Sequence, residues 1–197
     1  MFVNGLLSIL IIFSPLWPLG VNPTSSDPFL IINKSTNQLA LIDEGTIQHV
    51  YFVGTGKTEE LTPEGMFTIT VKAVQPYYRK KDIPGGDPKN PLGTRWIGFD
   101  ANNTEGRTFG VHGTNRPDSI GHYVSAGCIR MLNQDVEEVF SKVPLGTRIY
   151  ITRGAKSFQQ MGEEAGAIPT KRPTDWEHPY FFRGIPDFFQ HDKGHVQ

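Results

Sequence analysis

The sequence contains a single cysteine, Cys128, among 197 residues. One cysteine excludes an intrachain disulfide framework and a cysteine-rich zinc site. A basic excess is also missing, because 19 lysines and arginines stand against 20 aspartates and glutamates, for a net charge of -1. Proteins that bind nucleic acid normally carry such an excess. No nucleic-acid partner is therefore predicted.

No apolar run reaches the roughly 20 residues that a membrane-spanning helix needs. The segment 6–19 is mostly apolar and uncharged, with Pro15 and Pro18 near its end. Its length fits the apolar region of a secretory signal, although no Lys or Arg precedes it and no good cleavage site follows. We interpret residues 1–26 as a signal peptide or an N-terminal anchor, which would attach the chain to a membrane through residues 6–19. A first strand or helix of the domain is the alternative.

Turns and short strands dominate the rest of the chain. The 21 glycines and 15 prolines argue against a helical bundle. Apolar or alternating segments bounded by turn residues predict strands at 29–32, 39–42, 47–53, 66–74, 96–99, 108–111 and 147–152. In the 66–74 segment the alternation predicts one buried face, formed by Phe67, Ile69, Val71 and Ala73. The predicted fold class is mostly β.

One helix is clear, at residues 133–143. Its apolar positions recur at helical spacing and predict one buried face, formed by Val136, Val139, Phe140 and Val143. Asn133 is expected to cap the first turn, and Pro144 disfavours further helix.

Two segments carry no regular pattern. Residues 75–94 form a long loop rich in proline and glycine, and such loops are often lids or substrate-binding segments. Within it, Arg79-Lys80-Lys81 is either a substrate-facing basic patch or a solvated turn. Residues 154–197 are an aromatic-rich C-terminal extension, expected to pack on the domain or on a partner. His191 and His195 lie four apart there, but no further metal ligand is evident, which favours a solvated tail.

The stretch between Phe109 and Asn133 holds the residues that can carry chemistry. His112 follows an apolar strand, and Cys128 follows Gly127. A cysteine nucleophile needs a base or a positive neighbour, and it needs donors for an oxyanion. Arg130 lies two positions beyond Cys128, so in an extended segment both side chains point to one side. A lone His and Cys pair is weak evidence for catalysis by itself.

The order of several motifs makes the pattern specific. His112-Gly113 is followed sixteen positions later by the cysteine of Ser125-Ala126-Gly127-Cys128-Ile129-Arg130. Upstream stand the segments 33–39, Thr62-Pro63-Glu64-Gly65, 84–93 and 110–115. This arrangement resembles the YkuD-type L,D-transpeptidase catalytic domain of bacterial cell walls, from about residue 29 to residue 153. Many members have a histidine where this chain has Ala126, but His112 is the histidine that matches the base.

The resemblance implies a β-sandwich-like catalytic domain at residues 28–153. It implies acyl transfer through a thioester on Cys128, with His112 as the base. The residues implied to support the oxyanion or the substrate are Gly127, Ser125, Arg130 and Gly113. A third group is expected to orient His112; the sequence does not identify it, and in this family a backbone carbonyl often serves. The histidines outside the motifs, His122 and His49, are read as a loop residue and a structural residue. No metal or organic cofactor is implied.

The implied substrate is a peptidoglycan stem tetrapeptide, which loses D-Ala as a second stem forms a 3–3 cross-link. If water is the acceptor, the same site is an L,D-carboxypeptidase or another hydrolase. A non-catalytic cell-wall or coat protein is the remaining alternative. The expected location is extracytoplasmic, in the cell wall or secreted, and the sequence does not indicate an oligomeric state.

Overall fold

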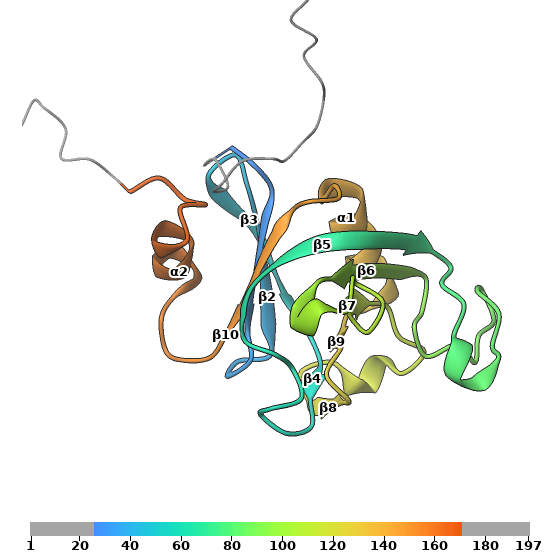
Figure 1. The fold of residues 1–197 in the computed structure, drawn as a ribbon. Helices are drawn as coiled ribbons and strands as arrows, with labels where there is room; N and C mark the ends of the chain where they lie inside the picture. The colour runs from blue at the N-terminus through green and yellow to red at the C-terminus, as the bar shows by residue number, and fades with distance from the viewer. Residues whose placement is uncertain (1–25, 171–197) are drawn as a thin grey trace, which may run out of the picture.

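The computed structural model describes residues 26–170 and builds them mainly from strands (Figure 1). The strands are β1 (Phe29–Asn33), β2 (Gln38–Asp43), β3 (Thr46–Phe52), β4 (Thr55–Gly56), β5 (Gly65–Val74), β6 (Arg95–Phe99), β7 (Phe109–His112), β8 (Tyr123–Ser125), β9 (Ile129–Arg130) and β10 (Arg148–Thr152). The helices are α1 (Asn133–Lys142) and α2 (Phe158–Glu164), with short 3-10 turns η1 (Arg79–Lys81), η2 (Ala101–Asn103) and η3 (Pro117–Ser119). The mostly β fold class predicted from the sequence is confirmed.

Eight strands form one curled sheet in the order β3-β2-β1-β10-β5-β6-β7-β9, and β4 pairs with β8 beside it. The long strand β5 joins the two halves, because its first part pairs with β10 and its second part with β6. The register with β6 shifts between Ile69 and Val71. An irregularity of this kind bends a strand and increases its twist. The two halves can therefore curl around a shared interior, as Figure 1 shows.

The main core lies between the two halves of the sheet. Leu30 and Ile32 of β1 meet Ile97 and Phe99 of β6 and Val111 of β7 in one fully buried cluster. The inner face of α1 joins this cluster through Val136, Val139 and Val143, all with no exposed surface, while Phe140 packs against it partly buried. This is the face that the helical spacing predicts. The shared interior fixes β7 and β9, the two strands that border the candidate site.

A second cluster lies on the outer face of β1 and β2. Phe29 and Ile31 of β1 pack there with Met161 of α2 and with Ile168. Strand β1 is therefore buried on both faces, which agrees with its unbroken apolar sequence. The sequence pattern did not predict α2. Its first turn is closed by a capping box between Ser157 and Gln160.

The start of α1 differs from the prediction in one respect. The residue at the cap position is Leu132, and no side chain caps the helix. Asn133 instead accepts hydrogen bonds at Oδ1 from the backbone N–H groups of Thr94 (3.3 Å) and Thr114 (3.1 Å). The predicted capping role of Asn133 is therefore wrong, because two neighbouring loops compete successfully for its side chain.

Several predictions fall outside the described residues. These are residues 1–25 of the predicted signal peptide or anchor, including the apolar segment 6–19, and the part of the C-terminal extension beyond residue 170 with His191 and His195. Between residues 26 and 170, no helix has the length and apolar character needed to cross a membrane.

Candidate active site

The turn that carries Cys128 is organised by the side chain of Ser125. Ser125 Oγ donates a hydrogen bond to the carbonyl oxygen of Cys128 (2.6 Å) and accepts one from the N–H of Gly127 (3.0 Å). Gly127 has φ +127°, a conformation that side chains rarely adopt, and a Cβ there would collide with the carbonyl oxygen of Leu61. The sequence Ser-x-Gly-Cys thus builds a tight turn that presents the thiol. The Gly127 N–H is already occupied within it.

A second loop, residues 57–64, forms hydrogen bonds with this turn and supports it. Thr62 Oγ1 donates to the carbonyl oxygen of Gly127 (3.0 Å) and accepts from the N–H of Gly56 (3.0 Å). The N–H of Lys57 donates to the carbonyl oxygen of Ser125 (2.9 Å). Thr62 is 1% exposed, so the two hydrogen bonds of its hydroxyl are shielded from water. The turn that carries Cys128 is therefore held by a buried polar contact with Thr62.

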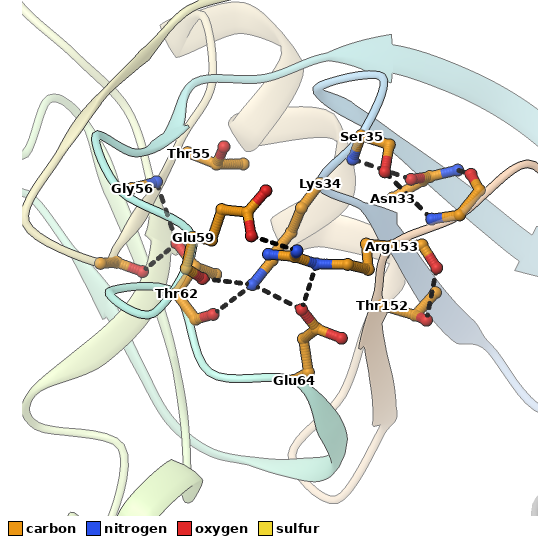
Figure 2. Close-up of polar contacts among 12 residues, drawn as sticks. Asn33, Lys34, Ser35, Thr55, Gly56, Glu59, Thr62, Glu64, Thr152 and Arg153 are labelled. Carbon is orange, nitrogen blue, oxygen red and sulfur yellow. Dashed lines mark hydrogen bonds and ion pairs between the residues drawn. The ribbon is translucent and has the colours of Figure 1, made fainter.

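Lys34 anchors the supporting loop (Figure 2). Its buried ammonium group donates to the carbonyl oxygens of Glu59 (2.7 Å) and Thr62 (2.8 Å) and pairs with Glu64 (2.9 Å). Arg153, just past β10, pairs with Glu59 and with Glu64 (2.8 Å). The hydrogen bond from Lys34 is the main cause that lowers the pKa of Glu64. A full set of partners is what a buried ammonium requires.

His112 lies at the end of β7, next to Arg130 of β9 in the parallel register. Its ring stacks on the Trp96 indole, with centroids 5.6 Å apart and planes 16° apart. Its Nδ1 is 2.6 Å from the carbonyl oxygen of Gly113. Because a carbonyl only accepts, Nδ1 carries the hydrogen of the neutral ring and Nε2 keeps a lone pair. A backbone carbonyl therefore orients His112.

Burial favours the neutral form of both predicted catalytic groups. Burial lowers the pKa of His112 to about 4; the nearby Arg130 acts in the same direction, and the carbonyls of Gly113 and Leu92 oppose it. Burial also raises the pKa of the Cys128 thiol, against the opposing effects of the Gly110 N–H, Lys80 and Arg130. At neutral pH these shifts favour a thiol and an imidazole over a thiolate and an imidazolium.

The thiol of Cys128 lines an open cavity of about 440 Å³. Its Sγ donates to the carbonyl oxygen of Thr108 (3.3 Å) in this conformation, while its backbone precedes β9, the strand next to His112. The other lining residues are Val71, Ala73, Pro76, Tyr77, Tyr78, Arg79, Lys80, Leu92, Trp96, Gly106, Arg107 and Thr108. Val71 and Ala73 were predicted to face the core. The register shift in β5 precedes both residues, and they form a wall of this cavity instead.

The 75–94 loop forms much of the cavity wall. Buried Asn90 ties its two limbs together by donating from Nδ2 to the carbonyl oxygens of Pro76 (2.8 Å) and Pro84 (3.0 Å). Arg79 and Lys80 border the Cys128 cavity, so the basic tripeptide faces the candidate site in part.

Gly113 is packed where no side chain fits. A Cβ there would collide with Asn133 Oδ1, which also holds Thr94 and Thr114. The remaining histidines lie elsewhere: His49 is an exposed residue of β3 that packs on Tyr51 (ring centroids 4.4 Å apart), and His122 is an exposed loop residue.

Comparison with known proteins identifies the family of this chain. Residues 27–151 match the family model described as the L,D-transpeptidase catalytic domain. The chain belongs to the L,D-transpeptidase family. It is 54% identical over 167 residues to YqjB of Bacillus subtilis (strain 168), a protein named as an L,D-transpeptidase, and the match covers 85% of this chain and 95% of that protein. YkuD of the same strain is 36% identical over 138 residues, covering 68% and 74% of the two chains.

A solved L,D-transpeptidase supports the same fold for this family member. The structure of L,D-transpeptidase 3 from Mycobacterium tuberculosis in complex with a faropenem-derived adduct aligns with a TM-score of 0.51 at 19% identity. The alignment covers 64% of this chain and 60% of the mycobacterial chain. At this identity the likeness concerns the fold alone.

Sequence reasoning missed several residues that shape the site. Thr62 was seen only as part of a turn motif, and Trp96 only as a strand residue. Lys34 and Arg153 lie at opposite ends of the described chain, and no local pattern connects them. The only signal was that the motifs around Lys34 and Thr62 recur in the family order.

Proposed function

We propose that this chain is a cysteine-dependent L,D-transpeptidase that acts outside the cytoplasm on peptidoglycan stem peptides and forms 3–3 cross-links. The observation that carries the proposal is the Cys128 thiol, which opens into a cavity beside the strand of buried, carbonyl-oriented His112, in a chain of this family. Residues 1–26 would direct export or anchor the chain.

The first half-reaction forms a thioester. Sγ of Cys128 attacks the carbonyl carbon of the third stem residue while Nε2 of His112 takes the thiol proton. Because both groups are neutral at rest, this proton moves together with the attack. The tetrahedral intermediate collapses, the C–N bond breaks, and His112 returns the proton to the departing amine of D-Ala.

The second half-reaction transfers the acyl group. The side-chain amine of a second stem attacks the thioester carbon and loses a proton to His112. The C–S bond breaks and the proton returns to the sulfur. Water in place of the amine yields a tripeptide, which is the carboxypeptidase outcome. These steps require no metal or organic cofactor.

The supporting residues act mainly by positioning Cys128 and His112. Ser125 holds the Gly127 N–H, so we assign both residues to positioning the Cys128 turn. Gly113 supplies the carbonyl that fixes the ring of His112. Arg130 places a positive charge near both reacting groups, where it favours the thiolate and an anionic substrate group.

Mass spectrometry of muropeptides tests the proposal. The full chain is incubated with disaccharide-tetrapeptide beside a Cys128→Ala control. A dimer that has lost one D-Ala, absent from the control, is the expected result. A tripeptide alone would reassign the chain to hydrolysis, and no Cys128-dependent product at all would overturn the proposal.

A further inference from the structure

A second cavity, of about 240 Å³, shares Tyr78 with the Cys128 cavity. Leu92 lines the Cys128 cavity, and its neighbour Pro91 lines the second one. The other lining residues are Lys81, Ile83, Lys89, Asn115, Arg116 and Arg130. We call this space the basic cavity.

The basic cavity is lined by four cationic side chains and by no carboxylate among the described residues. Those four, Lys81, Lys89, Arg116 and Arg130, form no ion pair within residues 26–170. By contrast, the cations Lys34 and Arg153 near the 57–64 loop are both paired with carboxylates. Four unpaired positive charges around one cavity repel each other and attract an anion.

The walls of the basic cavity are held by hydrogen bonds that involve the backbone. Tyr78 and Ile83 exchange hydrogen bonds of 2.9 and 3.2 Å across the loop. Asn115 Nδ2 donates to the carbonyl oxygen of Lys89 (3.0 Å), which ties the loop to the segment after His112. The N–H of Arg116 donates to Thr114 Oγ1 (3.0 Å). These hydrogen bonds therefore hold in place the loop segments that carry the four charged side chains.

The distance from the nucleophile limits which anion can reach this cavity. Arg130 lies two positions after Cys128, and two residues of extended chain span roughly 7 Å. A carboxylate one residue beyond the scissile carbonyl is within roughly 4 Å of that carbonyl along the substrate chain. The side chain of Arg130 can bridge the remaining distance and hold a carboxylate in a bidentate pair.

Resting on the proposed function, we propose that the basic cavity binds the terminal carboxylate of the leaving D-amino acid of the donor stem. Arg130 makes the contact nearest to Cys128, and Lys81, Lys89 and Arg116 supply the surrounding positive field. The cavity thereby selects stems whose carboxylate follows the scissile bond by one residue. A stem longer by one D-Ala carries its carboxylate about 3.6 Å farther away and fits less well.

Binding measurements on the full-length Cys128→Ala variant test this assignment without turnover. Two probes are titrated calorimetrically: a stem tetrapeptide with a free terminal carboxylate and the same peptide as its terminal carboxamide. The carboxylate is expected to bind at least about tenfold more tightly, the size of effect that a charge-assisted hydrogen bond supplies. Lys81→Gln and Arg116→Gln should each reduce that preference several-fold, and the exposed Lys142→Gln control should leave it unchanged.

The failures are distinguishable. Equal binding of the two probes, or a preference that Lys81→Gln and Arg116→Gln leave intact, overturns the inference while the muropeptide assay still decides the proposed function. No binding of either probe removes the proposed function and this inference with it. A polyglycerol phosphate that binds through Lys81 and Arg116, with no preference between the peptides, assigns the cavity to a wall polyanion and also overturns it.

Discussion

Thr62 Oγ1 donates a 3.0 Å hydrogen bond to the carbonyl oxygen of Gly127, a residue 65 positions later in the sequence. The same hydroxyl accepts from the N–H of Gly56. One buried side chain thus joins the loop anchored by Lys34 to the turn that presents Cys128. Neither Thr62 nor Gly127 lines the Cys128 cavity. Any effect of this contact on the reaction therefore arises from a change in the position of the thiol.

Replacing Thr62 by valine tests this link. Thr62→Val keeps the shape but leaves the Gly127 carbonyl and the Gly56 N–H unpaired, at a cost of about 1–3 kcal/mol in unfolding free energy. We expect the alkylation rate of Cys128 by iodoacetamide to change several-fold while the fold persists. Thr58→Val in the same loop, at an exposed position, is the control. A Thr62→Val protein with wild-type stability and thiol reactivity would contradict the link.

Gly127 combines a left-handed conformation with a close backbone approach, and a matched glycine separates the two effects. Gly154 has φ +130° but open space around its Cβ position, whereas a Cβ at Gly127, at φ +127°, collides with Leu61. Gly127→Ala should therefore lower the unfolding free energy by about 1–3 kcal/mol more than Gly154→Ala. Chemical denaturation of the two variants measures the difference. Equal losses would show that conformational strain alone accounts for Gly127.

The pKa of His112 predicts a loss of stability in acid. The folded protein holds this pKa at about 4, whereas an unfolded histidine titrates at 6.5. The unfolded state therefore takes up the proton first, so this contribution is complete above pH 6.5 and is lost as the pH falls toward 4, by about 3 kcal/mol. Denaturation of wild type and His112→Gln between pH 4 and 7.5 measures it. The variant should show a shallower decline; parallel curves would refute the assignment.

The raised pKa of the Cys128 thiol predicts slow alkylation at neutral pH. Since the thiolate is the nucleophile, the rate with iodoacetamide should still be rising at pH 9, the ordinary thiol value. Arg130→Gln removes a nearby positive charge and should move the profile to higher pH, while Lys142→Gln should not. A rate that levels off below pH 8 would mean that the resting cysteine is already a thiolate.

Local patterns predicted α1 and seven of the ten described strands, because burial on one or both faces produces a periodic pattern of apolar residues in the sequence. They did not predict the short strands β4, β8 and β9, which hold only two or three residues each. They missed α2, because this helix packs on β1 through few apolar residues, such as Met161, and therefore shows no clear helical period. The candidate nucleophile and base were predicted through family motifs. The roles of Thr62, Trp96 and Asn133 were not, since each depends on a partner that only the folded chain brings near. Asn133 is an example: its side chain is of a type that caps helices, but in the folded chain it accepts hydrogen bonds from two loop N–H groups instead.

The pairing of β1 with β10 has a consequence for how the chain folds. Strand β1 pairs with β2 on one edge and with β10 on the other, and β10 is the last strand within residues 26–170. Contacts between such distant segments slow folding, because the long loop must close before the pairing stabilises it. One edge of the apolar strand β1 therefore stays unpaired until β10, which ends at residue 152, can pair with it. A chaperone that covers β1 should therefore raise the yield of folded protein more than one that acts on the 75–94 loop.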